Sequence, residues 1–458
     1  MPDESMMRIC AAFAVLCLPF LAHSQHYYVD SLDGNDSSVG SLNEPWRSLQ
    51  PVNSTNFQPG DRIHLLRDRA FASRLDLNLV GNESAPIVFT AYGNGLPPKV
   101  PELRLSGTWL VIEKLDVDHR SGNNDAVRIR NLHNAVLQDL EIQNSRKDGV
   151  DVVGASNLTL SRLHIHHMLA GSYTNQVDAH GIALSNAHNV EIHSVDIHHV
   201  SGDSIQIDPN RTPGEIASDI RISSSKLWTG PLQEDFSTDW VQGQTPGENA
   251  LDTKVLKSGY ENEARMQIEI VDVSAFGWTK GSYVSNRAAF NLKEKVQVNI
   301  DRVTVYDSEI AFRIRGGLGN ANAVITNALI YDVDVAFRCE SNLENLMVNH
   351  ITLGHGVGDV LKPVAMTGGF DSWEWKNVAT VTADPDLAAL PASLVTAADF
   401  IDSRSLNYRP IKGSTLIDSG EASPVTTDRL SVVRDSVPDI GAFEYAASIP
   451  LPPQLLPQ

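Results

Sequence analysis

Short runs of alternating apolar and polar residues recur along the chain, several of them opening on a small or acidic residue. Eight copies, among them DGVDVV, HGIALS and IAFRIR, begin at residues 125, 148, 180, 203, 249, 288, 310 and 335. The closest starts are 22 to 25 residues apart, as from 288 to 310 and from 310 to 335. Alternation with a period of two is typical of β-strands and not of helices. The sequence therefore predicts a repeating strand unit, with loops filling the wider steps.

A second strand follows each copy at a nearly constant offset, as NAVLQDLEI, NLTLSRLHI and NVEIHSVDI do from Asn134, Asn157 and Asn189. Strands that repeat in this way, each covered by the next repeat, form a parallel solenoid. A β-sandwich would need antiparallel hairpins, and the NG and DG dipeptides do not stand where two-residue hairpin turns would need them. We therefore predict an all-β, single-stranded right-handed parallel β-helix with long loops on one face. Its interior ladder is predicted to comprise Val127, Val150, Ile182, Ile205, Leu251, Phe290, Phe312 and Phe337.

Segments near both ends carry a resemblance to a known group. YYVDSLDGNDSSVGSLNEPWRSL from Tyr27, PGDRIHLLRDRAF from Pro59 and PIVFTAYGNG from Pro86 resemble the opening coils of secreted β-helix polysaccharide lyases. DSRSLNYRPIKGSTLIDSG and, from Asp439, DIGAFEY resemble the C-terminal close of the same group. The group includes pectate lyases, chondroitinase-B and alginate lyases. The resemblance implies one β-helix domain over residues 25–445, followed by a Pro-rich tail over 446–458.

The N-terminus is predicted to be a signal peptide over residues 1–24. Arg8 precedes an apolar run, Ile9 to Leu21, that is too short to remain in a bilayer, and cleavage is expected near Ser24–Gln25. No second long apolar stretch follows, so we expect a secreted or periplasmic protein without a membrane anchor. Of the three cysteines only Cys339 lies outside the signal, which leaves no partner for an internal disulfide.

The charge of the chain limits the classes of partner it can bind, and its length bears on the number of domains. A net charge of −20 argues against nucleic acid, and against an acidic polysaccharide unless cations are concentrated locally. With 458 residues, 42% of them hydrophobic, the chain can bury a large core, and a solenoid can grow along one axis without a second domain. We expect a monomer.

The aligned strands place a local concentration of cationic side chains on the outer face of the solenoid, because side chains alternate between the two faces of a strand. The first outward column is predicted to read Arg128, Asp151, Ala183, Gln206, Asp252, Asn291, Arg313 and Arg338. The second is predicted to read Arg130, Val153, Ser185, Asp208, Lys254, Lys293, Arg315 and Glu340. Like charges on paired strands are destabilising, so the stack of Lys254, Lys293 and Arg315 favours a bound anionic ligand. The alternative is a solvated face whose charges extend into water.

Long loops beside the same coils are predicted to form the walls of a cleft. The loop from Trp228 to Glu248 carries Trp228 and Trp240, and the next loops carry Trp278, Tyr283 and Arg287. The tryptophans would stack on sugar rings, and Arg287 and Asn291 would bind substrate. The alternative is that the rings only anchor the loops.

The chemistry that best suits this patch is β-elimination from a uronic-acid-containing polysaccharide. Such a lyase must neutralise the uronate carboxylate, for which Arg313 and Arg315 are the candidates, and it must supply a base. Lys254 beside Lys293 is a like-charge pair, and the charged form of one member would be disfavoured, so this pair is the candidate base. The step of 22 residues from Lys293 to Arg315 also resembles the Lys-then-Arg pair of chondroitinase-B and alginate lyases.

Glu248 and Asp252, in ENALD, resemble the E-x-x-x-D calcium ligands of pectate lyases, and Asp208 lies one coil earlier. This resemblance implies a Ca²⁺ site formed by Asp208, Glu248 and Asp252.

Three other functions remain open. His180-Gly181 and Gly202-Asp203 resemble polygalacturonase-type glycosidases, and Asp203 with Asp208 would then serve inverting hydrolysis. Asp208-Pro209 partly matches the D-P-H-D motif of mannuronan C5-epimerases, although Asn210 replaces its histidine. A non-catalytic glycan-binding β-helix is the third.

The doublets His166-His167 and His198-His199 occupy equivalent ends of their coils. We expect structural ladders there in preference to metal ligands.

Overall fold

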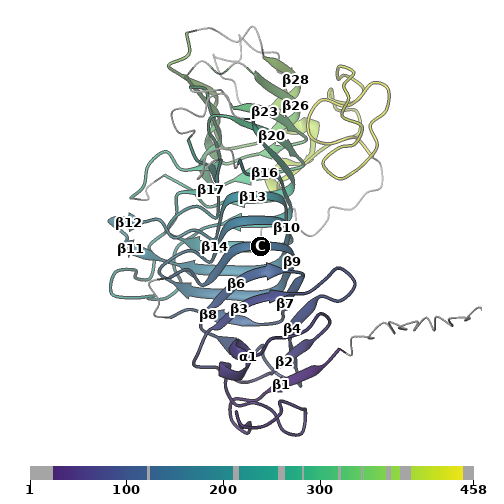
Figure 1. The fold of residues 1–458 in the computed structure, drawn as a ribbon. Coiled ribbons are helices and arrows are strands. Elements are labelled where there is room, and N and C mark those ends of the chain that lie inside the picture. The colour runs from purple at the N-terminus through teal and green to yellow at the C-terminus, as the bar shows by residue number, and fades with distance from the viewer. Residues whose placement is uncertain are drawn as a thin grey trace, which may run out of the picture.

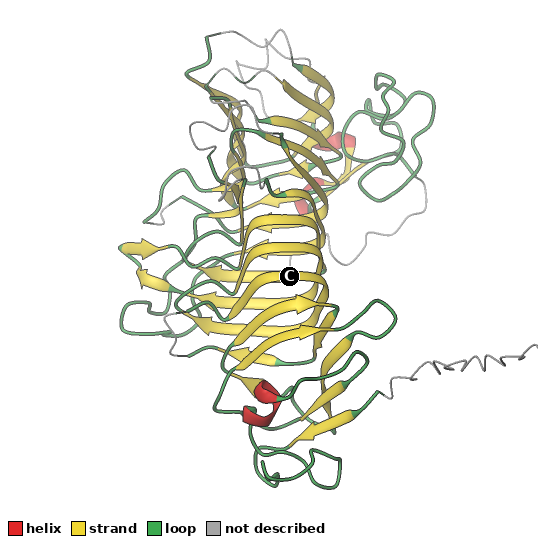
Figure 2. Ribbon diagram, viewed as in Figure 1, coloured by secondary structure: helices red, strands yellow, loops and turns green. Residues whose placement is uncertain are grey.

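Parallel strands coil about eleven times into a right-handed β-solenoid in this computed structural model (Figures 1 and 2). The predicted fold class is confirmed. The structure describes residues 24–120, 124–209, 216–255, 264–280, 283–317, 321–341, 343, 345–367, 373–381 and 393–446. Residues 1–23 of the predicted signal peptide and residues 447–458 of the predicted tail lie outside the described residues.

The strands form three parallel sheets along the axis of the solenoid. The first sheet contains β3 (Leu75–Val80), β6 (Leu103–Thr108), β9 (Val127–Ser145), β10 (Val150–Met168), β13 (Ile182–His193), β15 (Ile205–Asp208), β17 (Asn249–Thr253), β19 (Ala288–Leu292), β22 (Ser308–Arg315), β25 (Val333–Glu340) and β27 (Val357–Val364). The second contains β1 (His26–Val29), β2 (Arg62–Leu66), β4 (Ile87–Tyr92), β7 (Leu110–Glu113), β16 (Ser218–Trp228), β18 (Met266–Phe276), β20 (Val296–Asp301), β23 (Asn322–Thr326), β26 (Asn345–Leu353) and β28 (Glu374–Thr380), with the middle parts of β9, β10 and β13. The third contains β5 (Lys99–Val100), β8 (Asp116–Asp118), β14 (Asp196–Val200), β21 (Thr304–Tyr306), β24 (Leu329–Ile330) and β29 (Ser393–Leu394), with the ends of β9, β10, β16, β18, β26 and β28.

Asparagines make the bend between the first sheet and the second. Asn134, Asn157 and Asn189 have φ values of 53°, 54° and 52°, in the left-handed region that asparagine tolerates better than other non-glycine residues. Their amides form a ladder along the axis: Asn157 Nδ2 donates to Asn134 Oδ1 and Asn189 Nδ2 to Asn157 Oδ1, each at 2.7 Å. The asparagines that interrupt the strands in the sequence therefore turn the chain and join successive coils.

The predicted interior ladder is confirmed. Val127, Val150, Ile182, Ile205, Leu251, Phe290, Phe312 and Phe337 are all buried and in register from coil to coil. The three phenylalanine rings stack, with centroids 5.2 and 5.4 Å apart. Burying each such side chain stabilises the fold by roughly 1.5–3 kcal/mol. Because this ladder fixes the register, it also fixes which side chains point outward.

Additional elements flank the coils. The short helix α1 (Gln50–Ser54) lies beside the first turns, and the antiparallel pair β11 (Ala170–Ser172) and β12 (Asn175–Val177) projects from the middle of the solenoid (Figure 1). After β29 come η2 (Ala397–Asp399), β30 (Phe400–Asp402), η3 (Ser403–Ser405) and β31 (Asn407–Pro410).

The C-terminal segment leaves the path of the coils and packs against their side (Figure 1). Arg434 donates to Asn327 Oδ1 at 2.9 Å, and Arg429 donates to Thr304 Oγ1 at 3.0 Å. In the described part of the chain, no helix has the length and apolar character needed to cross a membrane.

Candidate functional site

The outward charged residues of the first sheet line up as the sequence predicts. Asp252 lies opposite Gln206 on one side and Asn291 on the other, and Arg313 lies between Asn291 and Arg338. Beside them, Arg315 is paired with Glu340, and the Lys254 backbone N–H donates to the Ile207 carbonyl of the preceding coil. The name charged column is used below for the residues on or directly after β17, β19, β22 and β25: Asp252, Lys254, Asn291, Lys293, Glu294, Arg313, Arg315, Arg338 and Glu340. Their predicted roles stay predictions.

Asp252 holds both lysines of the charged column. Its side chain is buried, and its Oδ2 lies 2.8 Å from Lys293 Nζ and 3.4 Å from Lys254 Nζ. Burial lowers the pKa of Lys254, but the carboxyl groups of Asp203 and Asp252, with others nearby, outweigh burial and hold that pKa above its ordinary value. The lysine pair was predicted to disfavour the charged form of one of its members; for Lys254 the opposite holds, because acidic groups dominate its surroundings.

Glu340 holds the arginines of the charged column. Arg313 Nε donates to Glu340 Oε1 at 2.9 Å, and Arg338 Nε lies 2.6 Å from the same oxygen. Arg315 forms longer ion pairs, 3.5 Å to Glu340 and 3.8 Å to Glu294. Burial raises the pKa of Glu340, and the arginines more than offset this and lower it. The basic stack thus has internal counter-charges, which the prediction of an anionic ligand did not take into account.

The three carboxylates predicted to bind calcium do not gather into one group. Among the described residues, the one set of three or more His, Cys, Asp or Glu side chains with ligand atoms all within 4.8 Å of one another is Glu141, His164 and His166. Asp252 Oδ2 is already bound by two ammonium groups. Asp208 and Glu248 with Asp252 therefore do not fit the implied Ca²⁺ site, and we assign calcium no step.

The three tryptophans predicted to bind sugar do not offer a ring face to a ligand. Trp240 and Trp278 are each only 1% exposed, and Trp240 Nε1 donates to the Ala170 carbonyl at 3.3 Å. Trp228 lies on the third sheet between the rings of His198 and Phe276, whose centroids are 4.4 and 5.8 Å away. These predictions are wrong because each ring packs against the protein itself, and the alternative, that the rings anchor structure, holds.

Arg287 also has a structural place. It is 1% exposed and donates to the Pro246 carbonyl at 2.9 Å and the Thr279 carbonyl at 3.4 Å, so it ties the two loops together. Burial lowers its pKa to about 10. The prediction that Arg287 binds substrate is therefore wrong. Asn291 stays in the charged column, with a buried Oδ1 that accepts no hydrogen bond.

A buried carboxyl group, that of Asp203, lies one coil before Asp252 of the charged column. Asp203 has no exposed surface; its backbone N–H donates to His180 Nδ1 at 2.9 Å, and its Oδ1 accepts from Asn249 Nδ2 at 2.8 Å. Burial, then the charges of Asp252 and Glu248, raise the pKa of Asp203 well above its usual value. A fully buried carboxyl cannot contact a polysaccharide, so the predicted hydrolytic pair of Asp203 and Asp208 is wrong.

At the level of sequence, Glu340 was given no functional role and Glu248 was given a different one, as a calcium ligand. Glu340 closes the second predicted column, so its place beside the arginines was visible in the alignment of repeats. Glu248 stands directly before β17, is partly exposed, and has a pKa raised by burial and then by Asp178. It is a carboxyl group that could carry a proton beside the charged column.

Comparison with known proteins supports the architecture. Residues 105–227 match the family model described as "Right handed beta helix region", and no curated protein matches the chain. The pectate lyase Pel9A is similar in structure, with 15% identity, a TM-score of 0.52, and coverage of 92% of this chain and 97% of Pel9A.

Two further solved structures are similar at lower scores. A rhamnogalacturonan lyase is 12% identical with a TM-score of 0.46, covering 85% of this chain and 94% of its own. The GH136 lacto-N-biosidase from Eubacterium ramulus is 14% identical with a TM-score of 0.44, covering 76% and 67%. At these identities the likeness concerns the fold. The chain is a right-handed parallel β-helix protein, and it shares this fold with the pectate lyase Pel9A.

Proposed function

We propose that this chain is a secreted polysaccharide lyase that cleaves a uronic-acid-containing polymer by β-elimination. The observation that carries the proposal is local charge. In a chain of net charge −20, five cations of the charged column share three carboxylates on four successive coils. The cations are Lys254, Lys293, Arg313, Arg315 and Arg338, and the carboxylates are Asp252, Glu294 and Glu340. An extended acidic polymer would supply the missing negative charge.

The arginines and the lysines of the charged column would have different functions. Arg313 and Arg315 would bind the uronate carboxylate, because guanidinium groups match carboxylates in shape and charge. This neutralises the charge that otherwise opposes removal of the proton on the neighbouring carbon.

The lysines would then transfer protons. Lys293 forms an ion pair with Asp252, so it would first pass its own proton to that carboxylate; the neutral amine would then take the sugar proton as base, the C–O bond to the next sugar would break, and a C=C double bond would form. Lys254 keeps its proton because its pKa is raised, so it would supply a proton to the leaving oxygen.

The experiment that tests the function uses the secreted protein with pectate, alginate and glycosaminoglycans, each with and without EDTA. Absorbance of the unsaturated uronate product and new reducing ends are followed together. We expect both signals to rise in parallel on one of these polymers. Absence of both signals on every polymer would overturn the proposal and leave a C5-epimerase or a glycan-binding protein.

Hydrolysis is the second candidate, and Glu248 is the observation that favours it. Its raised pKa suits a general acid, one of the two carboxyl roles that hydrolysis needs. Reducing ends without unsaturated product would select this function. A C5-epimerase, which shares the proton-abstraction step, would exchange the sugar proton with solvent without producing either signal.

We also propose that the protein is exported and monomeric, with residues 1–24 removed as a signal peptide. Mass spectrometry of the secreted protein should give an N-terminus at Gln25, and light scattering should give the mass of one chain. An uncleaved N-terminus would contradict the proposed export route.

A further inference from the structure

Histidines gather on the third sheet, away from the charged column. His166 stacks on His198 with centroids 5.1 Å apart and planes at 9°, and His167 stacks on His199 at 5.4 Å and 5°. The ladder predicted for these two doublets is confirmed. His164 and His166 of β10 also lie close to the carboxylate of Glu141, which belongs to β9 in the preceding coil. Stacking of the histidine rings does not by itself account for a carboxylate at this position.

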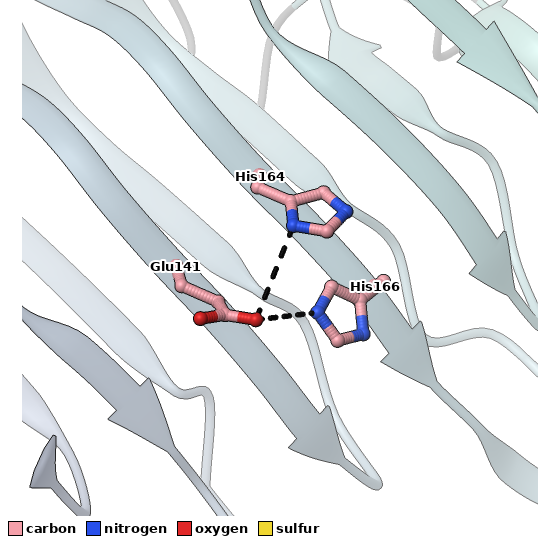
Figure 3. Close-up of side chains that lie close together, drawn as sticks. All are labelled: Glu141, His164 and His166. Atoms are coloured by element: carbon pink, nitrogen blue, oxygen red, sulfur yellow. Dashed lines mark hydrogen bonds and ion pairs between the residues drawn. The ribbon is translucent and has the colours of Figure 1, made fainter. Parts of the chain in front are cut away.

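Three side chains here point toward a common centre (Figure 3). Glu141 lies directly opposite His164 in the parallel register, and His166 follows two residues later on the same face of β10. Glu141 Oε1 lies 3.3 Å from His166 Nε2 and 4.0 Å from His164 Nδ1, and the ligand atoms all lie within 4.8 Å of one another. Two ligands bound tetrahedrally at 2.0–2.1 Å from one ion are about 3.4 Å apart, so little movement would close these atoms around a metal.

We propose that Glu141, His164 and His166 form a binding site for a first-row transition-metal ion of the Zn²⁺ class. Two imidazoles and one carboxylate suit Zn²⁺, Cu²⁺ or Ni²⁺, whereas Ca²⁺ and Mg²⁺ prefer an all-oxygen shell. Three protein ligands leave the fourth tetrahedral position to water or an exchangeable ligand.

The surroundings prepare these ligands for a metal. His166 Nδ1 lies 2.7 Å from His167 Nδ1, and a hydrogen bond there orients the ring and leaves Nε2 toward Glu141. The side chains of His164 and Glu141 are 46% and 39% exposed, which gives an ion a path from solvent.

The competing explanation is a hydrogen-bonded ladder in which His166 Nε2–H donates to Glu141 and no metal binds. The chain offers a matched control for it. His26 and His64 also stack in successive coils, with centroids 5.1 Å apart and ring nitrogens 3.2 Å apart. Among the described residues this pair belongs to no set of three close ligands. Paired imidazoles alone should therefore bind Zn²⁺ more weakly than the site with Glu141.

The experiment is calorimetric titration of tag-free full-length protein, first stripped with EDTA and dialysed, with ZnCl₂. We expect one equivalent of Zn²⁺ to bind to the wild type. Glu141→Gln and His166→Gln should each weaken this binding by at least about tenfold. The double variant His26→Gln/His64→Gln should bind as the wild type does.

A second measurement, the shift of Tm on adding Zn²⁺, distinguishes loss of the metal site from a failure to fold. Zn²⁺ should raise the Tm of the wild type and of the His26→Gln/His64→Gln variant by the same amount, and raise the Tm of Glu141→Gln by less. Because Glu141 lies at the surface, its replacement by an isosteric amide should fold even if His166→Gln does not. No Zn²⁺ bound by the wild type, or equal affinity in Glu141→Gln, would overturn the proposal.

Discussion

At the scale of single residues, Asp252 is the group on which the charged column depends. It lies between two ammonium groups, 2.8 and 3.4 Å from its Oδ2, and its own side chain is 2% exposed. Removing one partner of a buried ion pair leaves an uncompensated charge, which costs more than the pair contributes. A mutation at Asp252 should therefore affect stability as well as any activity.

Asp252→Asn should lower the free energy of unfolding by about 3 kcal/mol, because Lys254 and Lys293 would lose the buried carboxylate with which both form ion pairs. The matched control is Asp139→Asn, which breaks the exposed pair with Arg162 at 2.6 Å and should cost less than about 1 kcal/mol. Urea denaturation of both variants measures the difference. Equal losses would mean that the Asp252 pair is no stronger than a surface pair.

The free energy of unfolding should depend on pH through the titration of Asp203. Its pKa is raised in the folded protein, so the unfolded chain releases this proton first as the pH rises. Its contribution to stability is present below the unfolded pKa of about 3.9 and is lost as the pH rises through the folded pKa, with a slope of at most about 1.4 kcal/mol per pH unit.

Asp203→Asn removes this titration and retains an oxygen to accept from Asn249. The variant should therefore gain stability relative to the wild type between pH 4 and pH 7. Unfolding free energies of both proteins across this range provide the measurement. Parallel curves would show that Asp203 is not held protonated by the fold.

At the scale of elements, predictions that rest on the pattern within one repeat were confirmed. Predictions that depend on contacts between residues far apart in the sequence were not. Strand register was predictable because apolar alternation in each repeat forces one face inward, as the ladder from Val127 to Phe337 shows. Ring burial was not predictable, because Trp240 packs against Leu169 and Ala170, which lie some 70 residues earlier in a different coil. The roles predicted for the loops failed for this reason, while the column that carries the charges was found.

The same distinction explains the histidine cluster. Glu141 precedes His164 by one repeat of 23 residues, from 141 to 164, so their adjacency was readable from the sequence. The inward turn of the carboxylate toward two imidazoles depends on side-chain conformation, which the repeat does not specify.

The asparagine ladder can be tested as an element. Asn157→Ala should destabilise the protein by about 1–2 kcal/mol, since alanine tolerates a φ of 54° poorly and breaks two amide hydrogen bonds. Asn157→Gly keeps the backbone conformation and loses only the bonds, so its cost should be smaller. Thermal denaturation compares the two, and a glycine variant less stable than the alanine variant would contradict this account of the bend.

At the scale of the whole molecule, a strongly acidic solenoid presents one column in which five cations form ion pairs with three carboxylates. The repeat makes this possible, because equivalent positions of successive coils stack and sum their charges along the axis. The counter-charges Asp252, Glu294 and Glu340 hold the cations in place without neutralising all of them. A long acidic polymer would lie along such a column more readily than a small anion would.

The most direct test of this account is the initial rate at which the unsaturated uronate product forms on the responsive polymer, for the wild type, Lys293→Ala and Lys226→Ala. Lys226 lies on the third sheet, 4.9 Å from the ring of Trp228, and serves as the matched lysine outside the charged column. The account predicts a loss of at least about a hundredfold for Lys293→Ala and an unchanged rate for Lys226→Ala. A Lys293→Ala protein that is folded and as fast as the wild type would contradict it.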